Sequence, residues 1–297
     1  MNQVSELDQR FGIAGRACVV AGRGGLPMVK VETPQSAAEI YLHGAHVTHF
    51  QRKNEPPVLW LSAESKFDEK SPIRGGIPII LPWFGARAGQ TAAHGFARVK
   101  SWELADVAAS TTGVVTVRLR LPECSEFAGF SPFTADYVVT LGETLELELT
   151  VRNSTGHGLL AFEQCLHTYF TVGDIGAVSL AGLQGTMYLD KVGGSHERVE
   201  MGEAITIASE VDRVYMDTRA AVDIRDGKLR RTIRVEKENS ASTVVWNPWV
   251  AKSKAMADFG DEEYHTMVCV ESGNVGKNSL TLEEGKTMTM KVKVEIL

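Results

Sequence analysis

Cysteine is scarce in this sequence, with four in 297 residues and no two of them close together. A disulfide framework and a structural zinc site both require cysteines at short, regular spacings. The four cysteines are instead scattered along the chain, at Cys18, Cys124, Cys165 and Cys269. The sequence therefore predicts neither feature, and a reducing cytoplasm is the simplest setting to expect.

Long apolar runs and an excess of basic charge are absent as well. No stretch approaches the ~20 apolar residues of a membrane-spanning helix, and residues 1–10 lack the apolar core of a signal peptide. The net charge of −6 argues against nucleic-acid binding, which requires a basic surface. We expect no membrane or nucleic-acid partner, although a small cationic pocket for an anionic substrate is compatible with this charge.

Motifs for nucleotide, hydrolytic and metal chemistry are absent or incomplete. The sequence contains no Rossmann fingerprint, no Gly-x-Ser-x-Gly elbow and no kinase set of motifs. Three histidines are spaced by three, at His43, His46 and His49. In a strand His46 would point away from the other two, and no cysteine or carboxylate completes a ligand set. We therefore expect no metal site at these histidines.

Alternation of apolar and polar residues is the dominant pattern among the features that are present. It is clear in residues 115–121, 145–152 and 288–296. Strict alternation predicts half-buried strands, which are typical of antiparallel sheets. Because many such segments are separated by short turns, we expect an all-β fold, a large antiparallel β-sandwich with a few short helices.

Helical signals are weak, and no domain boundary is visible. Residues 5–11 could form a short helix with Ser5 as its cap, and residues 249–259 could form another, between a proline and a glycine. No linker, low-complexity tract or repeat interrupts the chain. We therefore expect one domain over residues 1–297.

The clearest chemical signal is a histidine on a predicted strand over residues 160–170. Because side chains alternate along a strand, Glu163, His167 and Tyr169 are expected on one face. An imidazole beside a carboxylate and a phenol suits proton transfer. A second apolar strand ends on Glu271, so His167 and Glu271 could serve as general acid and general base. Each of the two, taken alone, is more often an ordinary core or surface residue.

Two arginines lie near glycines in Arg74-Gly75-Gly76 and in His94-Gly95-Phe96-Ala97-Arg98. Glycine permits close approach of the backbone to a ligand, and the planar guanidinium fits phosphate or carboxylate. Either run alone could be a plain turn. Together, Arg74 and Arg98 could form a two-arginine clamp for an anion.

These motifs resemble those of the glucose-6-phosphate 1-epimerases, the hexose-6-phosphate mutarotase branch of the aldose 1-epimerase superfamily. The similar segments follow one another in order along nearly the whole chain, where a single one would be a weak signal. They are residues 44–47, 74–78, 82–85, 94–98, 163–170, 212–215, 246–249 and 270–274.

The resemblance implies a large antiparallel β-sandwich that uses no cofactor or metal and interconverts the α and β anomers of glucose 6-phosphate. It implies His167 as the general acid and Glu271 as the general base. It further implies that phosphate or sugar contacts come from Arg74, His94, Arg98 and Asp212. Some members carry a glutamine directly before the His-Gly-Phe-Ala-Arg motif. This chain has Ala93 there, and Gln90 is too far along the chain to replace that contact.

The expected chemistry is acid–base opening and reclosure of the sugar ring. Glu271 would be ionised and His167 protonated, a pairing that mutual attraction would favour. The two arginines favour a small sugar phosphate as the partner, and nothing demands more than a monomer. Two alternatives are a mutarotase for unphosphorylated aldoses, such as galactose, and a non-catalytic carbohydrate-binding or sensing protein on the same fold. A binding protein would have no need of the acid–base pair.

Overall fold

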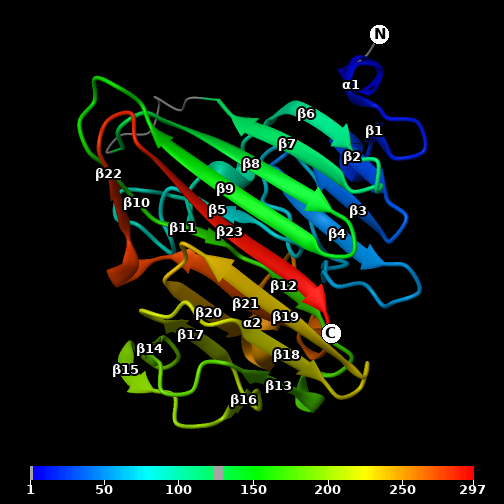
Figure 1. Cartoon of the computed structure of the whole chain (residues 1–297). Coiled ribbons are helices and arrows are strands. Elements are labelled where there is room, and N and C mark those ends of the chain that lie inside the picture. Colours follow the sequence, from blue (N-terminus) through cyan, green and yellow to red (C-terminus); the bar gives the residue numbers. More distant parts are fainter. Residues whose placement is uncertain (1–2, 123–129) are drawn as a thin grey trace.

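The computed structural model describes residues 3–122 and 130–297, and Cys124 lies outside these ranges. Within them the chain forms antiparallel sheets and two α-helices, α1 (Gln3–Phe11) and α2 (Trp249–Ala255) (Figure 1). The predicted all-β fold with few short helices is confirmed. Neither helix has the length and the apolar character needed to cross a membrane.

The largest sheet has nine strands, and its long central strands carry the predicted alternation. In spatial order the strands are β16 (Ala204–Thr206), β13 (Val178–Ala181), β18 (Val222–Asp226), β19 (Arg231–Glu238), β23 (Thr287–Ile296), β9 (Leu145–Asn153), β8 (Phe133–Leu141), β7 (Val115–Leu121) and β6 (Glu103–Ala109). Buried and more exposed residues alternate along β7, β8 and β9, so one face of this sheet packs inward.

A second, eight-stranded sheet carries the candidate acid–base residues. In order its strands are β15 (His196–Val199), β14 (Met187–Asp190), β17 (Val211–Tyr215), β20 (Ser242–Asn247), β21 (Met267–Asn274), β11 (Gln164–Leu166) and β5 (Ile79–Ile80), and β12 (Tyr169–Thr171) also pairs with β21. Two smaller sheets complete the fold, one of β1 (Ala17–Ala21), β2 (Pro27–Glu32), β3 (Ser36–Tyr41) and β4 (His46–Arg52), the other of β10 (Leu160–Phe162) and β22 (Leu280–Leu282).

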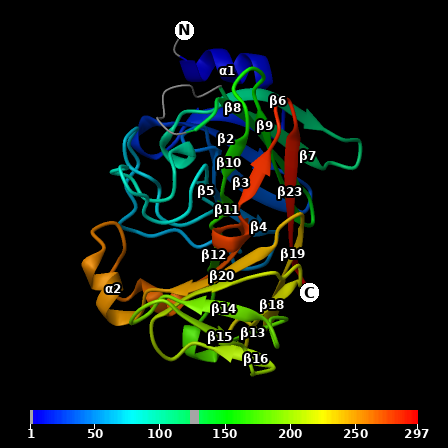
Figure 2. The same cartoon turned by 90° about the vertical axis from the view of Figure 1, so that its left-hand side faces the viewer.

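The main core is formed by side chains from both large sheets and from the four-stranded sheet. Strand β21 is buried along its whole length, and its Val268 and Val270 join the same apolar cluster as Leu147 and Leu149 of β9. Because side chains alternate, Glu271 projects to the other face of β21. In the turned view the nine-stranded sheet lies on one side of the molecule, and α2 with the loops between β4 and β6 lies on the other (Figure 2).

Two local predictions are wrong in detail. The strand predicted over residues 160–170 is broken into β10, β11 and β12. The break at Glu163 occurs because its carboxylate accepts hydrogen bonds from the backbone N–H groups of Phe84, at 2.8 Å, and Gly276, at 2.6 Å. The carboxylate of Glu163 thus ties two loops together and is not the proton partner of His167.

The predicted helix boundaries also differ from the observed ones. Helix α1 spans Gln3–Phe11, so Ser5 lies inside it and is not its cap. Helix α2 ends at Ala255, four residues before the predicted end. The chain leaves the helix because Asp258 forms an ion pair with Arg74 and Phe259 packs against Trp60, with ring centroids 4.9 Å apart.

Candidate active site

The predicted acid and base face each other across neighbouring strands. β11 and β12 pair with β21 in a single register, in which Leu166 lies opposite Ser272 and Tyr169 opposite Cys269. This register places His167 opposite Glu271, and 3.3 Å separates His167 Nε2 from Glu271 Oε1. Two titratable side chains are thus held in contact on central strands.

Burial shifts the pKa values of both groups toward their neutral forms. Glu271 is 1% exposed and His167 is 9% exposed. Burial, with a further contribution from Asp212, raises the pKa of Glu271 well above its usual value. Burial, with further contributions from His94 and the nearby arginines, lowers the pKa of His167 well below its usual value. Burial thus favours the neutral form of each group, whereas the 3.3 Å contact favours the ionised pair expected from the sequence, which stays a prediction.

A thiol that the sequence did not single out supports the carboxyl group. Cys165 lies one strand away on the same face, and its S–H donates to Glu271 Oε2 at 3.5 Å. One carboxyl oxygen thus faces a weak thiol donor and the other faces the imidazole. Because a thiol hydrogen bond stabilises a carboxylate less than a hydroxyl or amide would, this contact leaves Glu271 basic.

Aromatic rings fix the orientation of His167. Its ring stacks on Tyr169 with centroids 4.8 Å apart and planes 13° apart, and Trp246 and His94 meet it edge-on at 6.1 and 5.9 Å. Within the described residues His167 Nδ1 has no hydrogen-bond partner. His167, Cys269 and Glu271 together offer donor atoms within 4.8 Å of one another. A zinc-bound imidazole normally donates its other N–H to an acceptor, so this set suits proton transfer better than metal binding.

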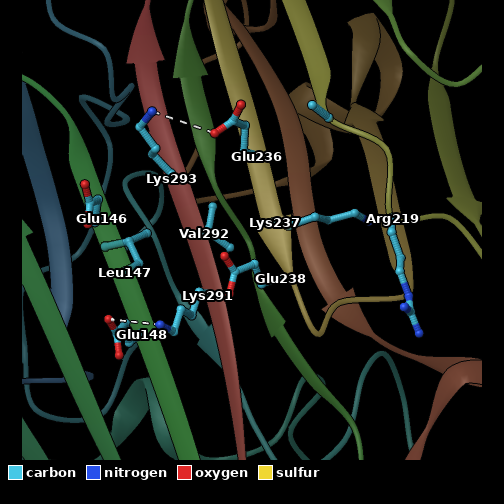
Figure 3. Close-up of a pocket in the computed structure, with 11 residues that line it drawn as sticks. Glu146, Leu147, Glu148, Arg219, Glu236, Lys237, Glu238, Lys291, Val292 and Lys293 are labelled. Carbon is cyan, nitrogen blue, oxygen red and sulfur yellow. Dashed lines mark ion pairs between the residues drawn. The ribbon is translucent and has the colours of Figure 1, made fainter.

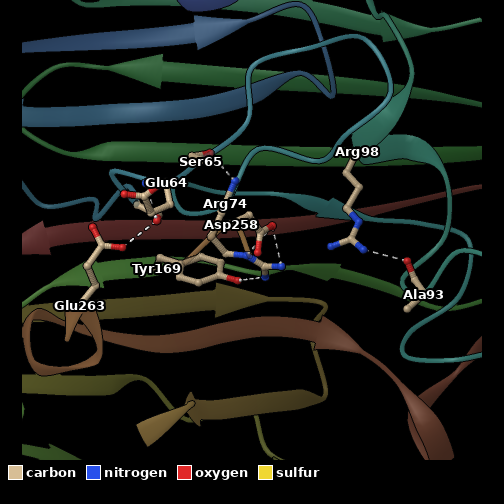
Figure 4. A network of polar contacts seen from close by, with 9 residues as sticks. Glu64, Ser65, Arg74, Ala93, Arg98, Tyr169, Asp258 and Glu263 are labelled. Atoms are coloured by element: carbon tan, nitrogen blue, oxygen red, sulfur yellow. Dashed lines mark hydrogen bonds and ion pairs between the residues drawn. The ribbon is translucent and has the colours of Figure 1, made fainter. Parts of the chain in front are cut away.

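Arg74 reaches the site, but its charge is already compensated. Its Nε and Nη2 donate to Asp258 Oδ2 at 3.2 and 3.0 Å, and its Nη1 donates to Tyr169 Oη at 3.0 Å (Figure 4). The partner Asp258 was missed because it lies in the segment predicted as helix. The two arginines therefore differ in their surroundings, and the two-arginine clamp stays a prediction.

Arg98 lies apart from this network in the same view (Figure 4). Its guanidinium donates to the carbonyl of Ala93 at 2.9 Å, and no ion pair involves it in the part of the chain that the structure describes. Burial lowers the pKa of Arg98 to about 10, which still leaves it cationic at neutral pH. Arg98 thus has no compensating carboxylate among the described residues, whereas Arg74 has Asp258.

His94 is held as a neutral hydrogen-bond donor. The backbone N–H of Gly85 donates to His94 Nδ1 at 3.3 Å, so the neutral ring carries its proton on Nε2. Burial, together with Arg98, lowers the pKa of His94 to about 3. This residue adopts a φ of +64°, a strained conformation for a residue with a side chain.

Glycines beside the arginines act on the chain's own backbone. A Cβ at Gly75, which has a φ of +111°, would lie 2.5 Å from Trp60 O, and one at Gly95, with a φ of +68°, would lie 2.0 Å from Leu81 O. Both glycines therefore lie close against the backbone of neighbouring segments, which fixes the backbone positions of Arg74 and His94.

Asp212 reaches the site from β17, where it pairs in register with Trp246. Lys252 of α2 lies nearby, with its Nζ 3.1 Å from Glu210 Oε1 and 3.7 Å from Asp212 Oδ2. Glu210 and Asp212 thus compensate the positive charge of Lys252. All six predicted site residues, His167, Glu271, Arg74, His94, Arg98 and Asp212, are linked by these contacts or by their mutual effects on pKa.

A hollow of about 480 Å³ elsewhere on the molecule contains none of these residues (Figure 3). It lies over β9, β23 and β19 and is lined by alternating acids and lysines. Lys293 Nζ lies 3.7 Å from Glu236 Oε2, and Lys291 Nζ lies 3.8 Å from Glu148 Oε1. These charges compensate one another, as expected of the solvated face of a sheet.

Comparison with known proteins gives consistent matches over most of the chain. The family model described as aldose 1-epimerase matches residues 27–295. A protein of Cenchrus ciliaris named "Putative glucose-6-phosphate 1-epimerase" is 38% identical over 84% of this chain and 78% of its own length. One of the same name from Escherichia coli K12 is 36% identical, with 87% of each chain covered.

Solved structures extend the comparison to the fold. The crystal structure of "a putative mutarotase" from Salmonella typhimurium matches with a TM-score of 0.88 at 32% identity, and covers 96% of this chain and 95% of that one. A galactose mutarotase-like protein from Clostridium acetobutylicum matches with a TM-score of 0.72 at 14% identity, over 95% and 98% of the two chains. At that identity the second match shows the shared fold alone.

Proposed function

Because this chain belongs to the aldose 1-epimerase family, we propose that it interconverts the α and β anomers of hexose 6-phosphates, with glucose 6-phosphate as its substrate. The observation that carries the proposal is the buried contact of 3.3 Å between His167 Nε2 and Glu271 Oε1. The proposal includes the setting expected from the sequence, a cytoplasmic monomer that uses no cofactor.

The reaction requires two proton transfers in each direction. In ring opening, Glu271 takes the proton of the C1 hydroxyl while His167 gives a proton to the ring oxygen, so that the ring C–O bond breaks and an aldehyde forms. The C1–C2 bond then rotates. In reclosure, His167 takes back the proton of the C5 hydroxyl as it attacks C1, and Glu271 returns its proton to the former aldehyde oxygen. No atom or electron is gained or lost overall.

Counting protons explains why neutral forms suit this pair. Before ring opening the single proton of the pair resides on His167, and in the open-chain state it resides on Glu271. The neutral acid and neutral imidazole favoured by burial therefore correspond to the protonation state that accompanies the aldehyde. The pair is matched to the intermediate, whose stabilisation lowers the barrier from both anomers.

The phosphate in the proposed substrate is supported by the relatives' names and by Arg98. The guanidinium of Arg98 is partly buried and has no carboxylate partner among the described residues, so an anionic ligand would stabilise it. The phosphate of the substrate would supply that compensation through charge-assisted hydrogen bonds. Arg74, already paired with Asp258, is assigned to the sugar hydroxyls instead, together with His94 and Asp212.

This division of roles gives a test with an internal control. Arg98→Met is expected to raise KM for glucose 6-phosphate by about 10- to 100-fold, the range for loss of a hydrogen bond between charged groups. KM for free glucose should change little. The matched variant Arg74→Met should raise KM for both sugars in parallel. Steady-state rates of anomerisation, followed by polarimetry on freshly dissolved α anomers, measure all four values.

The same assay distinguishes the alternatives. Equal loss for both sugars in the Arg98 variant would remove the phosphate argument and favour a mutarotase of free aldoses. Absence of turnover with glucose 6-phosphate, galactose and glucose, from folded protein, would favour a carbohydrate-binding protein on the same fold.

A further inference from the structure

We propose that Zn²⁺ binds to the imidazole of His167, the thiolate of Cys269 and the carboxylate of Glu271, and that it inhibits the enzyme by occupying its acid and its base. This inference rests on the proposed function and concerns the regulation of its site. Neither the sequence motifs nor the resemblance assigns a role to Cys269, and the proposed reaction does not use it.

The three donor side chains are brought together by strand pairing. Cys269 and Glu271 are two residues apart on β21, so their side chains lie on the same face of that strand. His167 lies between β11 and β12, which both pair with β21. One donor atom from each of the three side chains lies within 4.8 Å of the other two. The donor set is therefore formed by central strands and not by mobile loops.

The separations suit a tetrahedral zinc ion after a small adjustment. With Zn–N and Zn–O distances of about 2.0 Å, two such ligand atoms lie about 3.3 Å apart. His167 Nε2 and Glu271 Oε1 are already 3.3 Å apart. A thiolate with a Zn–S distance of about 2.3 Å lies about 3.5 Å from the other ligand atoms. Because the donor atoms all lie within 4.8 Å, the sulfur of Cys269 has to approach by about 1 Å.

Zinc binding leaves the net charge of this buried site unchanged. The thiol of Cys269 carries one titratable proton, and His167 and Glu271 hold one more between them. Both protons leave when Zn²⁺ binds, because its ligands are a thiolate, a carboxylate and a neutral imidazole. Cys269 is 0% exposed and Glu271 is 1% exposed. A complex in which two negative ligands compensate the ion avoids the high cost of burying an isolated charge.

The site lacks one feature of a tight zinc centre, so zinc acts here as an inhibitor and not as a resident cofactor. A zinc-bound imidazole normally donates its other N–H to an acceptor, and loss of such a contact costs about 10- to 100-fold in affinity. Among the described residues, His167 Nδ1 has no hydrogen-bond partner. Zinc is therefore expected to bind reversibly and to leave when a chelator is added.

Zinc stops the proposed reaction because the metal and the sugar need the same two groups. In ring opening, Glu271 takes a proton from the sugar and His167 gives one to it. When the carboxylate and the imidazole are both bound to Zn²⁺, neither can exchange a proton with the sugar. We therefore expect anomerisation to fall to the spontaneous rate at saturating Zn²⁺ and to recover with a chelator.

The test uses Cys269, which belongs to the metal site but not to the acid–base pair. Isothermal titration calorimetry with Zn²⁺ alone, in a buffer that does not bind zinc, should show binding to wild type. Cys269→Ala should weaken this binding at least about 10-fold, since loss of an outer contact alone costs about 10- to 100-fold. Alanine suits the position, because Cys269 lies in a cluster of buried apolar side chains. Turnover of glucose 6-phosphate should stay near that of wild type, and half-inhibition should require correspondingly more Zn²⁺.

The matched control is Cys18→Ala, at a half-buried cysteine on β1, which should keep the zinc affinity and zinc sensitivity of wild type. Mg²⁺ should inhibit neither protein, because it prefers oxygen ligands. Cys269→Ser repeats the test with a side chain of similar size, in case the alanine variant is unstable.

The outcomes separate the zinc site from the proposed function. If wild type turns over glucose 6-phosphate and the Cys269 variants remain as sensitive to Zn²⁺ as wild type, the zinc site is overturned and the function stands. The same conclusion follows if active wild type binds no Zn²⁺. If wild type turns over no sugar but binds Zn²⁺, and the Cys269 variants lose that binding, the function is overturned and the zinc site stands.

Discussion

Replacing Glu271 by glutamine is expected to slow anomerisation of glucose 6-phosphate by about 10²–10⁴-fold, the usual contribution of a positioned general base. The amide has nearly the same size and shape, but it cannot accept the proton of the C1 hydroxyl. Glu271 is buried beside His167 and Cys165, and the amide can keep these contacts without acting as the base. Polarimetry on the fresh α anomer measures the loss.

The same substitution should leave the fold intact, and its effect on stability should depend on pH. The pKa of Glu271 is raised in the folded state, so the carboxyl group contributes most below its unfolded value of about 4.3. That contribution is lost as the pH rises through the folded pKa. The melting temperature of wild type should therefore fall relative to the glutamine variant between acidic and neutral pH.

Glu262→Gln provides the control for Glu271→Gln, since Glu262 is exposed and its only described ion pair is with His265. It should preserve turnover and show no comparable pH trend. Turnover near wild type in Glu271→Gln would contradict the assigned role of the base.

Replacing His167 by glutamine should cause a loss of similar size, about 10²–10⁴-fold. Glutamine can hydrogen-bond the ring oxygen but cannot transfer a proton to it. His94 is a poor substitute, because its Nδ1 is already engaged by the backbone N–H of Gly85. The loss should appear in kcat and not mainly in KM, since the proton moves in the transition state.

Stability again gives an independent readout for His167. Its pKa is lowered in the folded state, so wild type should lose stability relative to the glutamine variant as the pH falls below about 6.5. His196→Gln, on the exposed strand β15, is the control and should show neither effect. A His167→Gln variant with normal kcat would require a different acid.

The strands could be predicted where local sequence alone determines them. Along β7, β9 and β23, alternation of apolar and polar residues reflects one buried and one solvated face. The break at Glu163 could not be predicted, because it depends on N–H groups contributed by Phe84 and Gly276. Such contacts join residues far apart in sequence and leave no local pattern.

In the candidate site, too, local sequence predicts some features and contacts between distant residues determine the others. His167 and Glu271 were recognisable from their motifs, but their register across β21 and the resulting 3.3 Å contact were not. The charge of Arg74 is compensated by Asp258, 184 residues away, which lies past the end of α2. Residue types therefore predict a chemistry, while tertiary contacts determine which cations are compensated and how burial shifts each pKa.

The most direct test of the central proposal is magnetisation-exchange NMR on equilibrated glucose 6-phosphate with the wild-type protein. The account predicts exchange between the α and β anomers well above the spontaneous rate, and its loss in Glu271→Gln and His167→Gln. Exchange at the spontaneous rate in the presence of folded wild-type protein would contradict it.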